Sequence, residues 1–356
     1  MEKRISIIIP NKNSYSYLKS CIDSITKLNY KNFEVIIVDN GSTEEDILDY
    51  YEILNKKNTY KIIKCKMEFN YSKMNNMGAE HATGDFLLLL NNDTMFVDPD
   101  TIKKMLKLAE KGDTGAVGVL MLFEDNTIQH IGVTIRHQLA KHHFKYNYYK
   151  RVEEFELNQW DNLQCDAVTG ACLLIKKQLY MNIAGLNESL KIAYNDIDLC
   201  LRLRKLGLKN YCVINSYIYH FESKSRGDKD ISNDIKLFNK ISEFSEEITY
   251  IDFYRLLNNA ALEKFINNQE FFIFGTSRAG QEAFALVCKN RLTNNFKGFI
   301  DNNSEKHNLI LNNYRIYNPN ILTNNSKIIV ASSFANQINL QLKKMGIKDE
   351  NVLFIN

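Results

Sequence analysis

The chain has 356 residues, of which 45% are hydrophobic and 24% charged, and this composition excludes a disordered tail and a fibrous repeat. Its 45 Lys and Arg residues against 42 Asp and Glu residues leave a formal net charge of +3, too small an excess for a protein dedicated to nucleic acid. Because a single hydrophobic core rarely grows beyond about 250 to 300 residues, the length predicts two domains.

The first half of the chain alternates β-branched runs with segments of helical periodicity, which is the pattern of βαβ units. The predicted strands are residues 5–9, 33–38, 61–65 and 86–90, and the predicted helices between them are residues 17–28, 44–54 and 72–82. We therefore expect an α/β domain whose doubly wound sheet is mostly parallel.

The second half of the chain predicts a connector and a smaller domain. Residues 229–267 have helical spacing with no glycine, and a new βαβ pattern begins at residue 271. We expect one domain at 1–228, a helical connector at 229–267 and a small α/β domain at 268–356. The apolar residues of the connector suit either an internal strut or the surface of a homo-oligomer.

The cysteines and the hydropathy of the chain indicate the cellular compartment in which we expect the protein. The seven cysteines form no C-x-x-C pair, and several lie in apolar runs, as free thiols of reducing compartments do. No apolar stretch approaches the ~18 residues that span a bilayer, and the N-terminus lacks the features of a signal peptide. We expect a cytoplasmic protein, and this pattern is compatible with peripheral contact at the inner face of the membrane.

Polar residues follow three of the predicted strands. They are Pro10 to Asn13, Asp39 to Ser42, and Asn91 to Asp93. Turn chemistry alone explains any one of these runs. Because ligands bind outside the carboxyl ends of the strands in a doubly wound sheet, three such runs on one edge indicate a ligand site. A carboxylate such as Asp93 at the mouth of a buried strand can hold a hard divalent cation.

Two further clusters carry groups suited to catalysis. Asp196 and Asp198 open a predicted helix, and side chains two residues apart on a helix point ~200° apart. One of them can therefore face a cleft while Asp198 pairs with Arg202 at i, i+4. His220 follows a second apolar run, where a histidine is more often a core or surface residue than a ligand.

These motifs, in this order, resemble glycosyltransferase family 2, a group of inverting enzymes that have the GT-A fold and use nucleotide-sugar donors. The resemblance covers residues 5–226. Its motifs are Ile7 to Pro10, Phe33 to Thr43, Phe69 to Gly78 with Gly84 and Asp85, Asn91 to Asp93, Thr169 to Cys172, Asn195 to Leu199, and His220. The family implies a doubly wound mixed sheet.

The resemblance also implies a donor site and a metal site. The residues it assigns to the donor nucleotide are Pro10, Asn11, Asn13, Asp39, Asn40, Lys73, Asn76 and Asn92. Asp39 would accept a hydrogen bond from the base, and Asp93 and His220 would hold Mn²⁺ or Mg²⁺. Asn91 stands where the family's D-x-D motif has its first acid, and this lowers the charge of the site.

By the same resemblance Asp196 is the general base. Thr169, Gly170, Ala171, Asn195 and Asp198 match the segments that contact the donor and acceptor sugars, with Asn195 in place of the family's Glu. The implied function is inverting transfer of a sugar, with a UDP-sugar favoured as donor. The implied acceptor is a glycan or a lipid-linked saccharide in the synthesis of a surface polysaccharide such as a capsule.

Two alternatives remain open at this point. A sugar nucleotidyltransferase would place a nucleotide and a metal on a similar sheet, but the N-terminal segment has no glycine-rich phosphate loop. A non-catalytic subunit that binds a nucleotide sugar or a glycan is suggested by Asn91 and Asn195, which replace acids. Residues 141–151 interleave basic and aromatic side chains. This pattern fits either a lid over acceptor sugars or a solvated surface loop.

The small domain resembles Rossmann-like domains at its first strand and turn. Gly275 and Gly280 bracket the turn at residues 275–280, and Ser277 occupies the position of the middle glycine. A pyrophosphate usually approaches the backbone there without a side chain in the way. This favours a structural or partner-binding module over a working dinucleotide site.

Overall fold

The computed structural model describes residues 2–136, 139–142, 145, 162–221, 231–241, 261–332 and 334–355. The chain divides into two compact units, whose main boundary falls after residue 246. The expected limits at 228 and 267 stay predictions, and much of the predicted connector lies outside the described residues.

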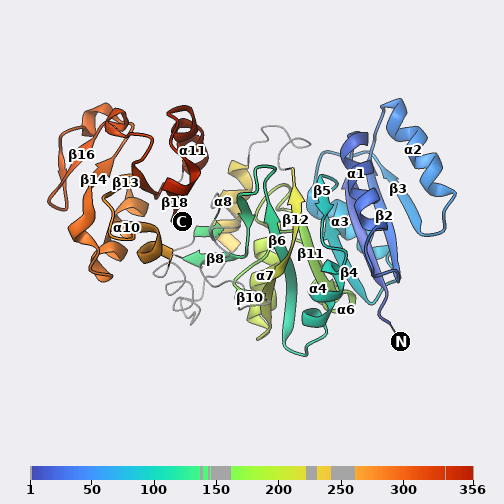
Figure 1. The fold of residues 1–356 in the computed structure, drawn as a ribbon. Helices are drawn as coiled ribbons and strands as arrows, with labels where there is room; N and C mark the ends of the chain where they lie inside the picture. Colours follow the sequence, from blue (N-terminus) through green and yellow to red (C-terminus); the bar gives the residue numbers. More distant parts are fainter. Residues whose placement is uncertain are drawn as a thin grey trace. The chain divides into compact units, whose positions relative to one another are not determined.

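A mixed sheet forms the centre of the first unit (Figure 1). The strand order is β10-β12-β6-β11-β4-β1-β2-β3. The strands are β1 (Ile5–Asn11), β2 (Phe33–Asn40), β3 (Tyr60–Cys65), β4 (Phe86–Leu90), β6 (Thr114–Leu122), β10 (Asn162–Cys165), β11 (Cys172–Lys176) and β12 (Lys209–His220). β1 to β4 are parallel to one another, whereas β11 runs antiparallel to β4 and β6. The predicted α/β class and the strands expected at 5–9, 33–38, 61–65 and 86–90 are confirmed.

Helices cover both faces of this sheet. The helices α1 (Tyr15–Thr26), α2 (Glu45–Asn55) and α4 (Thr101–Ala109) share one apolar cluster with Ile7 and Ile9 of β1. Burying each such aliphatic side chain contributes about 1.5–3 kcal/mol. On the opposite face α3 (Tyr71–Glu80) lies so close to β1 that a Cβ on Gly78 would stand 2.4 Å from Ile8 Cγ2.

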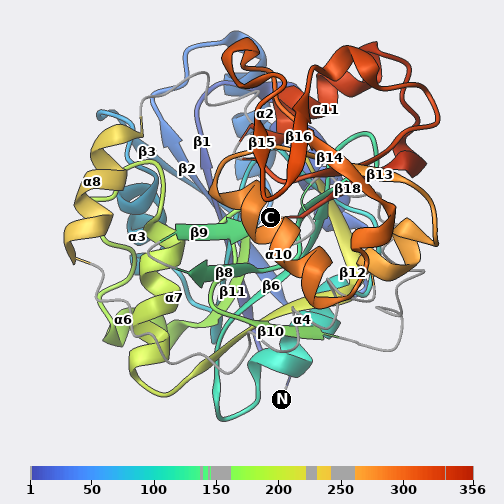
Figure 2. The same cartoon turned by 90° about the vertical axis from the view of Figure 1, so that its left-hand side faces the viewer.

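The first unit also contains further strands and helices. They are β5 (Thr94–Phe96), β7 (Ile128–His130), β8 (Val133–Arg136), β9 (Leu139–His142), α6 (Lys177–Asn182), α7 (Asn195–Lys205) and α8 (Ser232–Ile241). β5 pairs with β12 and β7 with β6, while β8 and β9 form a separate antiparallel ladder (Figure 2).

The second unit has its own sheet, with the strand order β15-β16-β14-β13-β17-β18. Its elements are β13 (Phe271–Phe274), α10 (Arg278–Lys289), β14 (Phe296–Ile300), β15 (Ile310–Leu311), β16 (Tyr314–Tyr317), β17 (Lys327–Val330), α11 (Ala335–Lys344) and β18 (Val352–Phe354), with 3-10 turns at Thr293–Asn295, Ser304–Lys306, Pro319–Ile321 and Asp349–Asn351. One apolar cluster packs α10 on the sheet and a second packs α11. The expected additional α/β domain is therefore present.

The close approach of α10 to β13 explains the two bracketing glycines. A Cβ on Gly280 would lie 2.0 Å from the carbonyl oxygen of Gly275, and Gly275 itself has φ +127°. Neither position accepts a larger residue without a backbone shift.

The sequence predicted free thiols and no apolar stretch long enough to span a bilayer. All seven cysteines are free thiols, and burial raises the pKa of Cys21 to about 12, which keeps this thiol protonated. Within the part of the chain that the structure describes, no helix is both long and apolar enough to cross a bilayer.

Candidate active site

The carboxyl ends of three parallel strands meet at one edge of the large sheet. Asn11 at the end of β1 stands opposite Asp39 near the end of β2, and Asn91 begins the turn that follows β4. Because β11 runs antiparallel to β4, it brings the segment ending at Ala171 to the same edge, where Asn91 N donates to Ala171 O over 2.9 Å. The convergence predicted from the sequence therefore exists in the fold.

A buried hydrogen-bonded path links these strand ends. Asn92 Nδ2 donates to Asn11 Oδ1 over 2.6 Å, and Asn11 Nδ2 donates to the hydroxyl oxygen of Tyr51 over 2.7 Å. The Tyr51 hydroxyl in turn donates to Asp39 Oδ1 over 2.9 Å. Burial raises the pKa of Tyr51, so its hydroxyl keeps its proton near neutral pH. Tyr51 lies on α2, and no local sequence signal marks it.

Asp39 is held as a hydrogen-bond acceptor. Oδ1 accepts from the hydroxyls of Tyr51 and Ser42, and Oδ2 accepts from the backbone N–H of Ser42 over 3.2 Å. The turn that places Ser42 passes through Gly41, whose φ is +70°. Oδ2 retains a second lone pair with which to accept an N–H from a ligand.

Asp93 and His220 meet beside this path. Asp93 Oδ1 lies 3.2 Å from His220 Nε2, and β5 pairs with β12 so that the two residues adjoin. Gln129 Nε2 donates to the carbonyl of His220 over 3.1 Å, and this orients Gln129 Oε1 toward His220 Nδ1 at 2.6 Å. The proton of the neutral ring therefore belongs on Nδ1, and the lone pair of Nε2 faces Asp93 and Asn91.

This donor set fits a divalent cation held by two side chains. An imidazole nitrogen and a carboxylate oxygen are ligands that Mn²⁺ accepts, and the orienting Gln129 has the place of an outer-shell partner. Among the described residues no three His, Cys, Asp or Glu side chains gather at a metal site. Phosphate oxygens and water would have to complete the coordination shell.

Asp196 lies against the segment at Thr169 to Ala171. Its Oδ2 accepts from Gly170 N over 2.8 Å, and its Oδ1 accepts from the N–H of Ile197 over 2.8 Å. The hydroxyl of Tyr71 donates to Gly170 O over 2.7 Å, which holds the same glycine from α3. Thr169 N donates to Nε2 of the buried His130 over 3.4 Å. Tyr71 lies in the motif at Phe69 to Gly78 but was assigned no role there, and His130 was not among the residues that the sequence indicated.

Three predicted donor residues bind backbone. Asn13 Oδ1 accepts from Thr43 N over 2.8 Å, and Asn40 exchanges two hydrogen bonds with the backbone of Met67. Pro10 and Lys73 were also predicted to lie near the nucleotide. Pro10 is part of β1, and Lys73 is exposed on α3. Asn40 therefore uses both ends of its amide to hold the backbone, and Asn13 uses its amide oxygen in the same way.

Asn76, the third such residue, is occupied by a loop. Its Nδ2 donates to Leu186 O over 2.9 Å, and its Oδ1 accepts from Leu186 N over 3.0 Å and from the hydroxyl of Tyr180 over 2.6 Å. Nδ2 also donates to Glu188 Oε1. These four hydrogen bonds use both N–H groups and both lone pairs of the Asn76 amide.

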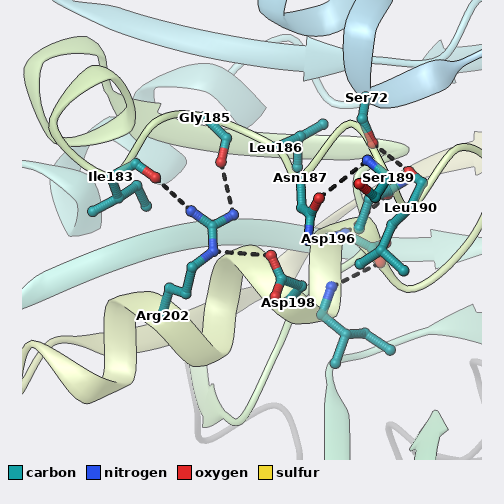
Figure 3. A network of polar contacts seen from close by, with 12 residues as sticks. Ser72, Ile183, Gly185, Leu186, Asn187, Ser189, Leu190, Asp196, Asp198 and Arg202 are labelled. Carbon is teal, nitrogen blue, oxygen red and sulfur yellow. Dashed lines mark hydrogen bonds and ion pairs between the residues drawn. The ribbon is translucent and has the colours of Figure 1, made fainter. Parts of the chain in front are cut away.

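Asp198 forms the expected ion pair with Arg202, at 2.9 Å (Figure 3). The same guanidinium donates to Ile183 O over 2.6 Å and to Gly185 O over 2.7 Å. A cavity of about 660 Å³ is lined by Asn76, Asp198, Arg202 and residues 183–188. Asp196 does not line this cavity, in keeping with the ~200° that separates positions 196 and 198 on a helix.

The structure thus brings together Asn11, Asp39, Asn92, Asp93, His220, Thr169, Gly170, Ala171 and Asp196 at one edge of the sheet. Asn195 lies beside Asp196 and donates from Nδ2 to Leu190 O over 3.3 Å. Most of the predicted lid at 141–151 lies outside the described residues.

Comparisons with known proteins agree with this arrangement. Residues 6–183, half of the chain, match the family described as Glycosyl transferase family 2, and residues 267–353 match a family described as C2185-like, N-terminal. An uncharacterised protein of Sinorhizobium fredii is 35% identical over 257 residues, which is 69% of this chain and 27% of that protein. An O-antigen biosynthesis protein of Myxococcus xanthus, RfbC, is 31% identical over 63% of this chain and 18% of its own length.

The chain therefore spans 27% of the length of the first of these curated relatives and 18% of the second. Among solved structures, GalNAc-T7 with UDP, GalNAc and Mn²⁺ aligns over 75% of this chain and 54% of its own, with a TM-score of 0.54 and 14% identity. A likeness at this identity shows the fold, which is the GT-A fold that the sequence motifs implied.

Proposed function

The chain belongs to glycosyl transferase family 2, and we propose that it transfers a sugar from a nucleoside-diphosphate donor to a hydroxyl group, with inversion at the anomeric carbon. The observation that carries this proposal is the buried path from Asn92 through Asn11 and Tyr51 to Asp39, with Asp93 and Asp196 on the same sheet edge. A glycan or lipid-linked saccharide of a surface polysaccharide is the proposed acceptor, a choice supported by the O-antigen relative.

The chemistry of Asp39 supports a preference for the donor base. Its remaining lone pair on Oδ2 needs an N–H donor. Uracil and guanine present such a ring N–H, whereas the corresponding nitrogen of cytosine is itself an acceptor and would be repelled. Among the bases with such an N–H we propose uracil, and hence a UDP-sugar as the favoured donor, a choice supported by the UDP in GalNAc-T7.

Asp93 and His220 are the proposed holders of a divalent cation, Mn²⁺ or Mg²⁺. When bound, the cation would neutralise charge that develops on the departing diphosphate. Asn91 contributes an amide in place of a second acid, so the site carries one carboxylate and should bind the cation weakly until the diphosphate adds its oxygens.

Asp196 has the proposed role of general base. Each carboxylate oxygen already accepts one backbone N–H and keeps a second lone pair for an acceptor hydroxyl. As the acceptor oxygen bonds to the anomeric carbon, the bond from that carbon to the diphosphate oxygen breaks and the hydroxyl proton passes to Asp196. A single displacement of this kind inverts the anomeric centre.

A thermal-shift screen of the purified protein tests the donor site. We would compare UDP, GDP, dTDP and CMP, each with and without Mn²⁺, because a ligand that binds only the native state raises the melting temperature. We expect UDP with Mn²⁺ to give the largest rise, and Asp93→Ala to remove the part that depends on the metal. A response to none of these nucleotides would contradict the proposal.

A non-catalytic subunit that binds a nucleotide sugar is the second candidate, favoured by the two amides Asn91 and Asn195 at the site. It predicts the same thermal shifts as the first. Release of free UDP from a UDP-sugar, or transfer to an acceptor, separates the two candidates because a binding subunit produces neither.

A further inference from the structure

A buried carboxylate that has not been discussed so far accepts hydrogen bonds from three successive backbone N–H groups. Asp234 lies in the first turn of α8 and is 6% exposed. Its Oδ2 accepts from Ile192 N over 2.7 Å and from Ala193 N over 2.8 Å, and its Oδ1 accepts from Lys191 N over 3.3 Å. A carboxylate with three such donors fixes the backbone of the segment far more firmly than one neutral hydrogen bond does.

The next residue along this segment is held by the same helix. The ring of Tyr194 packs on the buried ring of Phe238, with centroids 4.8 Å apart. Phe238 follows Asp234 by four residues, so both side chains lie on one face of α8. Tyr194 has φ +61°, a left-handed conformation that a tyrosine adopts only where its surroundings impose it.

α3 holds the opposite side of the segment. Tyr71 N donates to Lys191 O over 2.7 Å, and Ser72 Oγ donates to Leu190 O over 2.6 Å, as Figure 3 shows for Ser72. The turn at 190–194 is thus bound between α3 and α8, and α7 begins directly after it with Asn195 and Asp196.

We propose that Asp234 is a positioning residue for Asp196. By holding the three amides that precede α7, it sets the first turn of that helix and so the place of the Asp196 carboxylate beside Gly170. This inference rests on the proposed role of Asp196 as base. It makes α8, which lies beyond the residues that match the family, part of the machinery of transfer.

Asp234→Asn tests the proposal. The variant keeps the shape of the side chain but places an N–H₂ group against backbone N–H donors, which removes at least one hydrogen bond of the three. Because a displacement of about 1 Å at a reacting group can cost 10²-fold, we expect kcat for transfer to fall ~10- to 100-fold. The KM for the donor and the UDP-induced thermal shift should stay within about twofold, because Asp39 and Asp93 come from other elements.

Lys236→Ala, an exposed position on the same helix, is the matched control and should leave kcat unchanged. Phe238→Leu, which loosens Tyr194, should reproduce the loss in kcat by a second route. Hydrogen exchange at the amides of Ile192 and Ala193 should accelerate in Asp234→Asn and remain slow in Lys236→Ala.

Unchanged kcat in Asp234→Asn, in a protein whose transfer is lost on Asp196→Asn, would overturn this inference alone. An equal loss of donor binding and kcat would also overturn it, because it would indicate general damage to the fold. Absence of transfer by the unmodified protein would instead overturn the proposed function.

Discussion

At the scale of single residues, the orientation of Asp196 is the feature most open to test. Backbone N–H groups of Gly170 and Ile197 each occupy one lone pair of its carboxylate. Asp196→Asn should lower transfer by ~10²- to 10⁴-fold, the usual contribution of a general base. The UDP-induced thermal shift should be retained, because Asp196 has no contact with the path at Asp39. Initial rates with Asp49→Asn, an exposed residue of α2, provide the control.

Gln129 leads to a prediction about metal affinity that does not depend on turnover. Its two hydrogen bonds orient the ring of His220 and place the ring proton on Nδ1. Loss of an outer-shell partner typically costs 10- to 100-fold in metal affinity, so Gln129→Leu should weaken Mn²⁺ binding by about that factor. Titration of Mn²⁺ by electron paramagnetic resonance in the presence of UDP measures the effect. Equal affinity in Gln129→Leu and the unmodified protein would contradict the orienting role.

At the scale of elements, Arg202 ties α7 to the loop at 183–185. It donates to Asp198 and to two carbonyl oxygens in a planar arrangement that lysine cannot reproduce. Arg202→Lys should therefore destabilise the protein by about 1–3 kcal/mol. Lys19→Ala breaks an exposed i, i+4 pair with Asp23 and should leave the stability almost unchanged, because solvent and salt screen such a pair. Urea unfolding of both variants measures the two changes in the free energy of unfolding.

Glu34 connects β2 to β1 and to the turn before β4, and its contribution depends on pH. Burial alone would raise the pKa of Glu34, but hydrogen bonds from Ser6 and from the backbone and hydroxyl of Thr83 outweigh it and lower the pKa. A carboxyl whose pKa is lower in the folded state stabilises the protein above its unfolded pKa, about 4.3, and loses that effect as the pH falls through the folded pKa. In urea unfolding at pH 7, Glu34→Gln should lower the free energy of unfolding by about 1 kcal/mol relative to the unmodified protein. Below pH ~4 the two proteins should differ less.

At the scale of the whole molecule, the chain consists of two units with separate cores. Gly280→Ala should destabilise the second unit by about 1–3 kcal/mol or more, because its Cβ would meet the carbonyl of Gly275. The UDP-induced shift of the first unit should persist in this variant. Gly112→Ala, where no atom lies within 4 Å of the added Cβ, is the control. Scanning calorimetry with and without UDP follows the two units separately.

The sequence by itself determined the class of fold, the parallel strands and the edge at which Asp39 and Asp93 would lie. These follow from hydrophobic periodicity and from polar residues at strand ends, which are local properties. It also determined the pairing of Asp198 with Arg202, since an i, i+4 spacing needs no tertiary information.

Only the tertiary structure decided which side chains support that edge. Gln129 meets His220 across 91 residues of sequence, and Tyr51 and Tyr71 reach the site from α2 and α3. Asp234 of α8 binds the segment that precedes α7. It also showed that the amides of Asn76 and Asn40 bind backbone, although the motifs placed both at the nucleotide. The physical reason is that a side chain's partner depends on how crossover helices pack on the sheet, and no local pattern in the chain encodes that packing.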